Sequence, residues 1–191
     1  MSHIFKATIL CGLTFLFVNV AKADILIEPY LGYTMGNVTT TLDTGSTLKW
    51  DNNNAILGAR VGYEFVVLMA GLDYDTMLSG KLKGQGGQPD LDATASQLYL
   101  FAGARLPLIR AWAGYGLMNE VHGKSGGVDT KYTGNSLKVG ASFTGFPIIA
   151  LNLEYIMNNF DKENDNALST YATSKVESNL VMLSVSAPLS F

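Results

Sequence analysis

One histidine near the middle of the chain is the strongest candidate for chemistry. His122 is the only histidine beyond position 3, with Glu120 two residues before it and Ser125 three residues after it. A carboxylate, an imidazole and a hydroxyl are the groups that acid–base and nucleophilic catalysis combine. The surrounding segment, His-Gly-Lys-Ser-Gly-Gly, has the composition of a loop. We therefore favour a loop histidine over a catalytic one and predict no enzymatic activity.

A larger set of ionisable residues occupies alternate positions in segments whose other positions are apolar. The set comprises Glu28, Arg60, Glu64, Asp73, Asp75, Arg105, Arg110, Glu120, Lys138 and Glu154. Side chains of a β-strand alternate between its two faces, so the whole set is expected on one face of a sheet. Charges inside a narrow barrel are costly unless they are paired or hydrated. Six acids and four bases could largely neutralise one another, which predicts an ionic network in a barrel lumen.

The turns between these segments predict specific partners. A tight turn at 66–67 places Arg60 directly across from Asp73, which predicts a cross-strand salt bridge. Lys138 is matched with Glu154 in the same way around a turn near Phe146. Arg105 and Arg110 would face each other across 107–108, so they need Glu28, Glu64 or water at the same height. A structural plug is the favoured interpretation, and a conduction path is the alternative.

No cofactor or metal site is predicted. Asp161, Glu163 and Asp165 alternate in a polar segment and could attract a divalent cation, but we favour a solvated acidic loop over a metal site. The net charge is −3 and no basic patch is present, so nucleic acid is excluded as a partner.

The elements that would position the charges are eight strands of period two. They are predicted at 25–36, 55–65, 68–79, 96–106, 109–121, 135–145, 149–158 and 177–191. Tight connectors at 66–67, 107–108 and 146–148 alternate with longer polar loops at 37–54, 80–95, 122–134 and 159–178. The opposite face of all eight strands is almost free of charge. The fold class is therefore predicted as all-β, an eight-stranded antiparallel up-and-down transmembrane β-barrel.

Aromatic residues recur on the apolar face. Tyr33, Tyr74, Tyr115 and Tyr155 are about 40 residues apart, and three of them stand at one height above the tight turns. Rings of this kind favour a membrane interface. We predict them as an outer aromatic girdle, with Phe65 and Phe191 in the opposite girdle.

The N-terminal segment 1–23 has the features of a signal peptide. Lys6 precedes an apolar stretch too short to span a bilayer, and Ala21-Lys22-Ala23 is a small-residue cleavage site. The single cysteine, Cys11, lies inside this segment. Cleavage would leave 24–191 as one barrel domain without a thiol or a disulfide.

The final strand carries the last part of the pattern. Apolar residues stand at every second position from Val181 to the C-terminal Phe191, whereas the inner face holds Met182 and three serines. This strand is expected to be a neutral seam beside Glu28, with the charges on strands two to seven.

The whole pattern resembles the small eight-stranded outer-membrane barrels of Gram-negative bacteria, of the OmpA transmembrane domain and OmpX kind, often described as porin-like. The resemblance implies export through the periplasm to the outer membrane and contact with lipids and lipopolysaccharide. It also implies insertion by the barrel-assembly machinery, with Phe191 as the assembly signal. A monomer is the expected oligomeric state. A soluble barrel would face its charges outwards; long strands, level tyrosines and terminal Phe191 favour the membrane type.

Three functional hypotheses follow from this resemblance. The first is a structural or surface-interaction protein whose four exposed loops vary in function. The second is a narrow channel for ions or small solutes. The third is a lipid-modifying enzyme at His122, which the predicted lumen-facing side of that residue disfavours.

Overall fold

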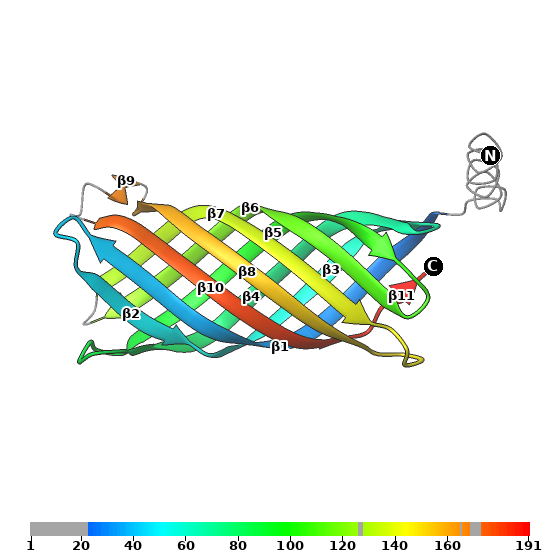
Figure 1. The fold of residues 1–191 in the computed structure, drawn as a ribbon, viewed down its shortest axis with the longest axis horizontal. Helices are drawn as coiled ribbons and strands as arrows, with labels where there is room; N and C mark the ends of the chain where they lie inside the picture. The colour runs from blue at the N-terminus through cyan, green and yellow to red at the C-terminus, as the bar shows by residue number, and fades with distance from the viewer. Residues whose placement is uncertain (1–22, 126–127, 165, 169–172) are drawn as a thin grey trace, which may run out of the picture.

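Antiparallel strands joined edge to edge form a closed barrel in the computed structural model, which describes residues 23–125, 128–164, 166–168 and 173–191 (Figure 1). The long strands are β1 (Ala23–Leu42), β3 (Asn54–Phe65), β4 (Leu68–Gly84), β5 (Leu91–Arg105), β6 (Ile109–Ser125), β7 (Val128–Phe143), β8 (Ala150–Glu163) and β10 (Thr173–Ser186). Short strands are β2 (Thr47–Asn52), β9 (Asn166–Ala167) and β11 (Leu189–Ser190). β2 continues into β3, and β11 extends β10. The barrel wall therefore consists of eight antiparallel strands, which confirms the predicted fold class. The predicted signal peptide, 1–23, lies almost wholly outside the described residues.

The barrel closes between its first and last strands. β1 pairs with β3 on one side and with β10 on the other, both antiparallel. Pro188 has no N–H to donate, and regular pairing is interrupted between β10 and β11. Beyond the break Phe191 and Ile25 exchange two backbone hydrogen bonds, N to O, of 3.1 and 2.9 Å. The last residue is therefore part of the closure.

The strands extend well beyond their predicted ends. Most of the segments predicted as long polar loops are paired strand, including the upper part of β1 with β2 and the upper parts of β4 to β7. Backbone pairing does not require apolar side chains, and alternation of Thr, Lys and Asp with inward apolar residues continues there. The loop prediction was therefore wrong over most of 37–54, 80–95 and 122–134. Short turns at one end and the loop end opposite are nevertheless clear in Figure 1.

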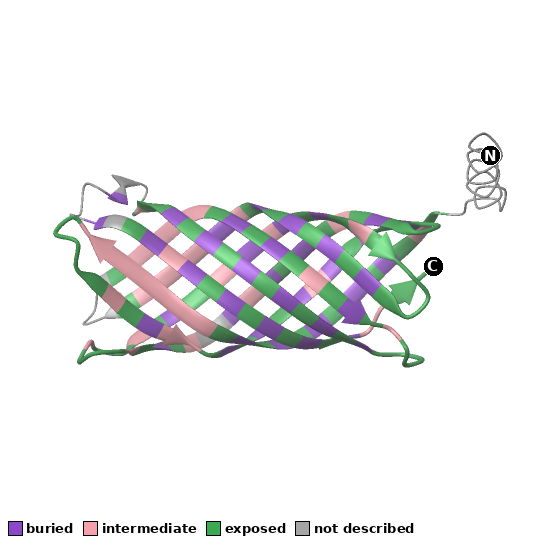
Figure 2. Ribbon diagram, in the orientation of Figure 1, coloured by how far each residue is buried: buried purple, intermediate pink, exposed green. Residues whose placement is uncertain are grey.

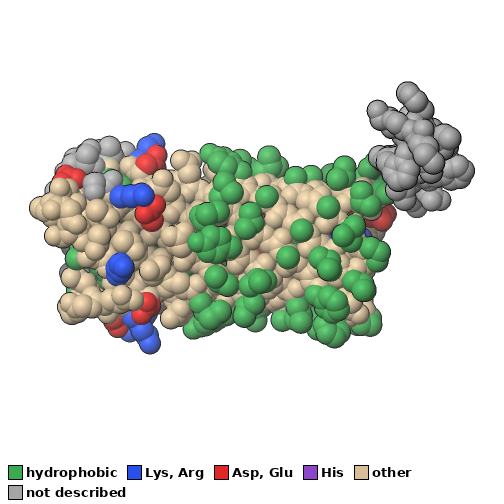
Figure 3. Space-filling view, in the orientation of Figure 1, with side chains coloured by type: hydrophobic (Ala, Val, Ile, Leu, Met, Phe, Trp, Pro, Cys, Tyr) green, Lys and Arg blue, Asp and Glu red, His purple; other side chains and the backbone are tan. Residues whose placement is uncertain are grey.

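Burial alternates along most of the length of the long strands, as the period of two requires, whereas the loop-side end of β1 is half-buried throughout (Figure 2). Outward residues near the tight turns are large and apolar, for example Leu31, Leu72, Leu100 and Leu153, each 44–63% exposed. Figure 3 shows these side chains gathered over the part of the barrel that holds the chain ends, whereas Lys, Arg, Asp and Glu appear toward the loop end. The described residues contain no helix long and apolar enough to cross a membrane. The exterior thus consists of an apolar band and a polar extension.

Candidate functional site

Arg60 of β3 is the centre of a buried ionic network inside the apolar band. Its side chain is 0% exposed, and it contacts Asp73 at 3.3 Å, Glu154 at 2.6 Å and Glu28 at 3.4 Å. Asp73 lies directly opposite on β4, as the tight turn predicts. Glu28 and Glu154 come from β1 and β8. One guanidinium therefore joins four strands across the lumen.

Lys138 of β7 forms the second half of this network. Its Nζ lies 3.0 Å from Asp73, 2.5 Å from Asp75 and 3.8 Å from Glu154. The hydroxyl of Tyr30 donates to Asp73 at 2.7 Å and lies 3.4 Å from Asp75. Each carboxylate consequently has a charged partner, the condition under which buried ions are tolerated.

A lower tier lies nearer the tight turns. Arg110 donates two hydrogen bonds, of 2.9 and 2.6 Å, to the carboxylate of Glu28. Arg105 and Arg110 face each other in the β5–β6 register, and Arg105 pairs with Glu64. The Arg105 side chain is 46% exposed, so it belongs to the rim of the barrel. We call Glu28, Arg60, Asp73, Asp75, Arg110, Lys138 and Glu154 the ionic network, and Arg105 with Glu64 the rim pair.

Aromatic rings clamp the cation at the centre. The Arg60 Cζ atom lies 4.6 Å from the ring centre of Tyr30 and 4.3 Å from that of Trp112, distances typical of cation–π contacts. Glycines make the space: a Cβ atom on Gly58 would approach Tyr30 Cζ to 2.2 Å, and one on Gly140 would approach the Trp112 ring to 2.5 Å. Because Gly58 and Gly140 have no side chains, they leave room for the two rings that contact Arg60.

Two sequence expectations about the charges are corrected. Lys138 is opposite Ile156, and Glu154 is opposite Gly140, because the β7–β8 connector spans 144–149 and is wider than predicted. The two charges lie 3.8 Å apart, and Lys138 makes its shorter contacts with Asp73 and Asp75. The network also includes Glu28 of the first strand, so it is not confined to strands two to seven.

Glu120 is the third correction. Leu98 pairs with Met118 and Tyr99 with Gly116, which leaves Leu117 as an extra residue in β6. A β-bulge of this kind reverses the faces that follow. Asn119 is consequently buried inside, whereas Glu120 faces outward and pairs with Lys131 at 3.0 Å. Period-two counting missed the bulge, which has no signal in the local composition.

The same bulge turns His122 outward, opposite to the predicted lumen-facing side. Its Nδ1 lies 3.7 Å from Asp129 Oδ1, and Lys124 lies 3.4 Å from the same carboxylate. The backbone of Ser125 pairs with Val128, but its side chain lies outside the described part of the structure. Asp165, the last residue of the acidic set Asp161, Glu163 and Asp165, also lies outside the described residues. The described contacts place an acid and a lysine beside His122 at the surface.

A belt of neutral polar groups covers the ionic network on its loop side. Gln97 Nε2 donates to Asn119 and Asn158 at 2.8 and 3.0 Å, and Ser136 donates to Asn158 at 2.6 Å. The Tyr99 hydroxyl donates to Gln97 Oε1 at 2.7 Å. Among the described residues the closing strand adds no charge to the lumen: its inward Ser184 and Ser186 accept from Asn152, both at 3.0 Å, and Ser186 donates to Glu28.

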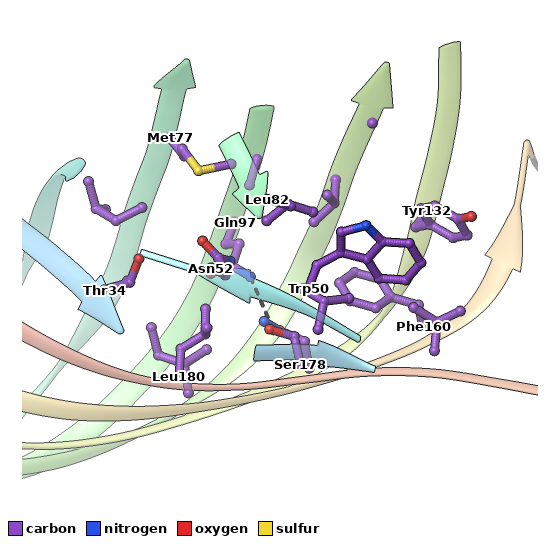
Figure 4. A pocket seen from close by; sticks show the side chains of 18 of the residues that line it. Thr34, Trp50, Asn52, Met77, Leu82, Gln97, Tyr132, Phe160, Ser178 and Leu180 are labelled. Carbon is purple, nitrogen blue, oxygen red and sulfur yellow. Dashed lines mark hydrogen bonds between the residues drawn. The ribbon is translucent and has the colours of Figure 1, made fainter. Parts of the chain in front are cut away.

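Above this belt the lumen becomes apolar. Its walls include Trp50, Ile56, Met77, Leu82, Ile156 and Leu180, which surround a cavity of about 90 Å³ (Figure 4). We call this space the apolar chamber. About half of its lining, including Trp50 and Leu82, comes from segments predicted as loops, and sequence analysis did not identify the chamber. The alternation of Lys81 and Lys83 around Leu82 was the available signal.

The predicted girdle residues all point outward. Tyr33, Tyr74, Tyr115 and Tyr155 are 41–54% exposed, Phe65 is 44% exposed and Phe191 73%. Three of the tyrosine hydroxyls donate to neighbouring asparagines, at Asn53 O, Asn135 Oδ1 and Asn179 Oδ1. An apolar ring with its hydroxyl turned to a polar residue suits a membrane interface.

Comparison with known proteins supports the assignment of the fold and does not assign a family. No family model matches the chain, and no curated protein matches it. Neisserial surface protein A superposes with a TM-score of 0.52 at 17% identity, over 87% of this chain and 98% of that one. Ail, the attachment invasion locus protein of Yersinia pestis, solved with the heparin analogue sucrose octasulfate, gives 0.57 at 15% identity, over 87% and 99%. The chain therefore has the fold of these outer-membrane barrels.

Proposed function

We propose that this chain is an integral outer-membrane barrel whose lumen is closed by the ionic network, and that it acts through structural or surface interactions. The observation that carries the proposal is Arg60, fully buried and in contact with acids from three other strands. A solute crossing the barrel would have to separate these contacts. Separating a buried pair leaves uncompensated charge and costs about 3–5 kcal/mol.

The exterior supports the membrane part of the proposal. An apolar band with outward tyrosines on its loop side is the surface expected of a barrel in lipid. On this proposal the band contacts outer-membrane lipids and lipopolysaccharide, Phe191 serves as the signal for the barrel-assembly machinery after export, and the barrel is a monomer.

The polar extension supports a surface role. Strands that continue beyond the band present charged residues such as Lys49, Lys83 and Asp92 away from the lipid. Neisserial surface protein A is named as a surface protein, and Ail is named as an attachment protein. We propose a comparable, non-enzymatic role here, carried by the loop end.

Planar-bilayer recording of the refolded protein tests closure. We expect no steady current steps from the wild-type protein. Lys138→Ala should introduce conductance because it removes the cation between Asp73 and Asp75, whereas Lys131→Ala, which alters an outward pair, should not. Steady wild-type channels whose ion selectivity changes in Lys138→Ala, but not in Lys131→Ala, would establish a pore instead. A heat-modifiability gel confirms that each variant is folded.

A further inference from the structure

The apolar chamber has the character of a binding site. It lies between the polar belt and the loop end, and Figure 4 shows Trp50, Leu82, Met77 and Leu180 around it. Its volume of about 90 Å³ is of the same order as the roughly 150 Å³ apolar cavity that stays dry and binds benzene. Space of this kind accommodates a small, slender apolar molecule.

The space is not a packing gap between crowded side chains. Gly123 of β6 lines the chamber, and a Cβ atom built on it would meet nothing within 4 Å. Any larger residue at this position would project into the free volume. The barrel wall therefore leaves the chamber open at a point where most side chains would fill it.

The charge of the chamber selects against anions. Its described lining contains no Lys or Arg, and its one acid is Asp75, which is held by Lys138 at the floor. Burial, followed by the nearby charge of Glu163, raises the pKa of Tyr132 to about 12, so this residue is neutral at physiological pH. A carboxylate ligand would lie near Asp75 without a free cation and would lose its hydration.

One polar group in the wall lacks a partner. Ser178 is 2% exposed, lines the chamber, and its Oγ has no hydrogen-bond partner among the described residues. Buried hydroxyls are normally hydrogen-bonded, because an unmet one is costly. A ligand with one hydroxyl or carbonyl would satisfy it.

We infer that the apolar chamber binds a small neutral aliphatic molecule bearing a single hydrogen-bonding group, a primary alcohol of about three carbons being the simplest chemistry of this size. The aliphatic chain lies against Ile56, Met77 and Leu180. The polar end contacts Ser178. This function is separate from closure of the lumen below, and its test does not depend on conductance.

Trp50 provides a direct reporter. The chain has two tryptophans, so Trp112→Phe leaves Trp50 alone in the chamber wall. The protein is placed in phosphatidylcholine nanodiscs and titrated with 3-bromopropan-1-ol, whose bromine quenches a contacting indole. Saturable quenching is expected. Gly123→Phe should abolish it by filling the chamber, and Thr94→Phe, on the outward face of β5, should not.

The polar end is tested by varying the probe and the wall. Ser178→Ala should weaken binding of the alcohol about fivefold, the worth of one hydrogen bond, and leave binding of 1-bromopropane unchanged. At pH 8, 3-bromopropanoate should bind at least about tenfold more weakly than the alcohol. Quenching that rises linearly with probe and is equal in Gly123→Phe would overturn the site. Equal affinity for carboxylate and alcohol would overturn the neutral ligand. If Gly123→Phe fails a heat-modifiability gel, Ala95→Leu fills the same chamber.

Discussion

Removing one cation from the ionic network should have a cost that depends on what its partners retain. In Arg60→Met, Asp73 keeps Lys138 at 3.0 Å, Glu154 keeps Lys138 at 3.8 Å and Glu28 keeps Arg110 at 2.6 Å. Each of the three acids that lose Arg60 therefore still has a cation within ion-pair distance. Breaking a buried pair costs about 3–5 kcal/mol, and we expect Arg60→Met near the lower limit of this range.

Lys138→Met should cost more. Asp75 forms its only ion pair in the described structure with Lys138, at 2.5 Å, and would keep only the Tyr30 hydroxyl at 3.4 Å. Its charge would then lie beside Asp73 without compensation. We expect a loss in the free energy of unfolding near 5 kcal/mol, the upper limit for a broken buried pair. Arg60 and Lys138 each contact three acids, but the larger loss of stability is expected at Lys138, because it is the only cation paired with Asp75 in the described structure.

The assay is urea unfolding of the refolded protein in phospholipid vesicles, followed by tryptophan fluorescence. Trp112 lies over Arg60 and reports on the network directly. Lys131→Met is the matched control, because its pair with Glu120 is about one-third exposed and should be worth less than about 1 kcal/mol. Asp75→Asn should restore much of the stability lost in Lys138→Met.

Two outcomes would refute this reasoning. If Arg60→Met were more destabilising than Lys138→Met, the number of remaining cations would not set the cost. If Lys138→Met were no worse than Lys131→Met, the interior would be hydrated enough to screen Asp75.

Three further predictions concern packing, assembly and the band. Gly140→Val should lower the free energy of unfolding by about 1–3 kcal/mol, because its side chain collides with the Trp112 ring, whereas Gly123→Ala should be neutral in the same assay. Phe191→Ala should reduce the amount of barrel in outer-membrane fractions but barely change the unfolding of refolded protein, because the ring is 73% exposed. Leu153→Arg, at an outward position of the band, should cost about 2–4 kcal/mol in vesicles; a cost near zero would place that position outside the lipid.

The sequence predicts the fold because its strongest signal is also the strongest constraint on a barrel. Alternation of apolar and polar residues fixes which side chains face inward, and the two-residue turn at 66–67 fixes the register of β3 against β4. The Arg60–Asp73 contact follows from those two facts alone. The meeting of Arg105 with Glu64 required one more step, since like charges across the 107–108 turn need an acid at the same height.

Register changes are where the same signal fails. Nothing in the composition of β6 marks Leu117 as an extra residue, yet it decides that Glu120 faces outward. In β4 the register also shifts between Met77 and Gly80, after which Leu82 faces inward. These shifts depend on how three strands fit together, so information local to one strand cannot specify them. The apolar chamber was missed both because of these shifts and because part of its wall, including Trp50, lies in segments predicted as loops.

One barrel wall combines two different interiors. Nearer the tight turns the wall is apolar outside and charged inside, and Lys138 and Arg60 connect the strands. Toward the loop end the wall is charged outside and apolar inside, as in a soluble ligand-binding barrel, with Lys81 and Lys83 outward and Leu82 inward. An unbroken period of two is compatible with both interiors, because β8 places Glu154, Ile156 and Phe160 on its inner face without a register shift between them. The change of interior therefore depends on which residue types occupy the inward positions, and the register shifts in β4 and β6 determine which positions those are.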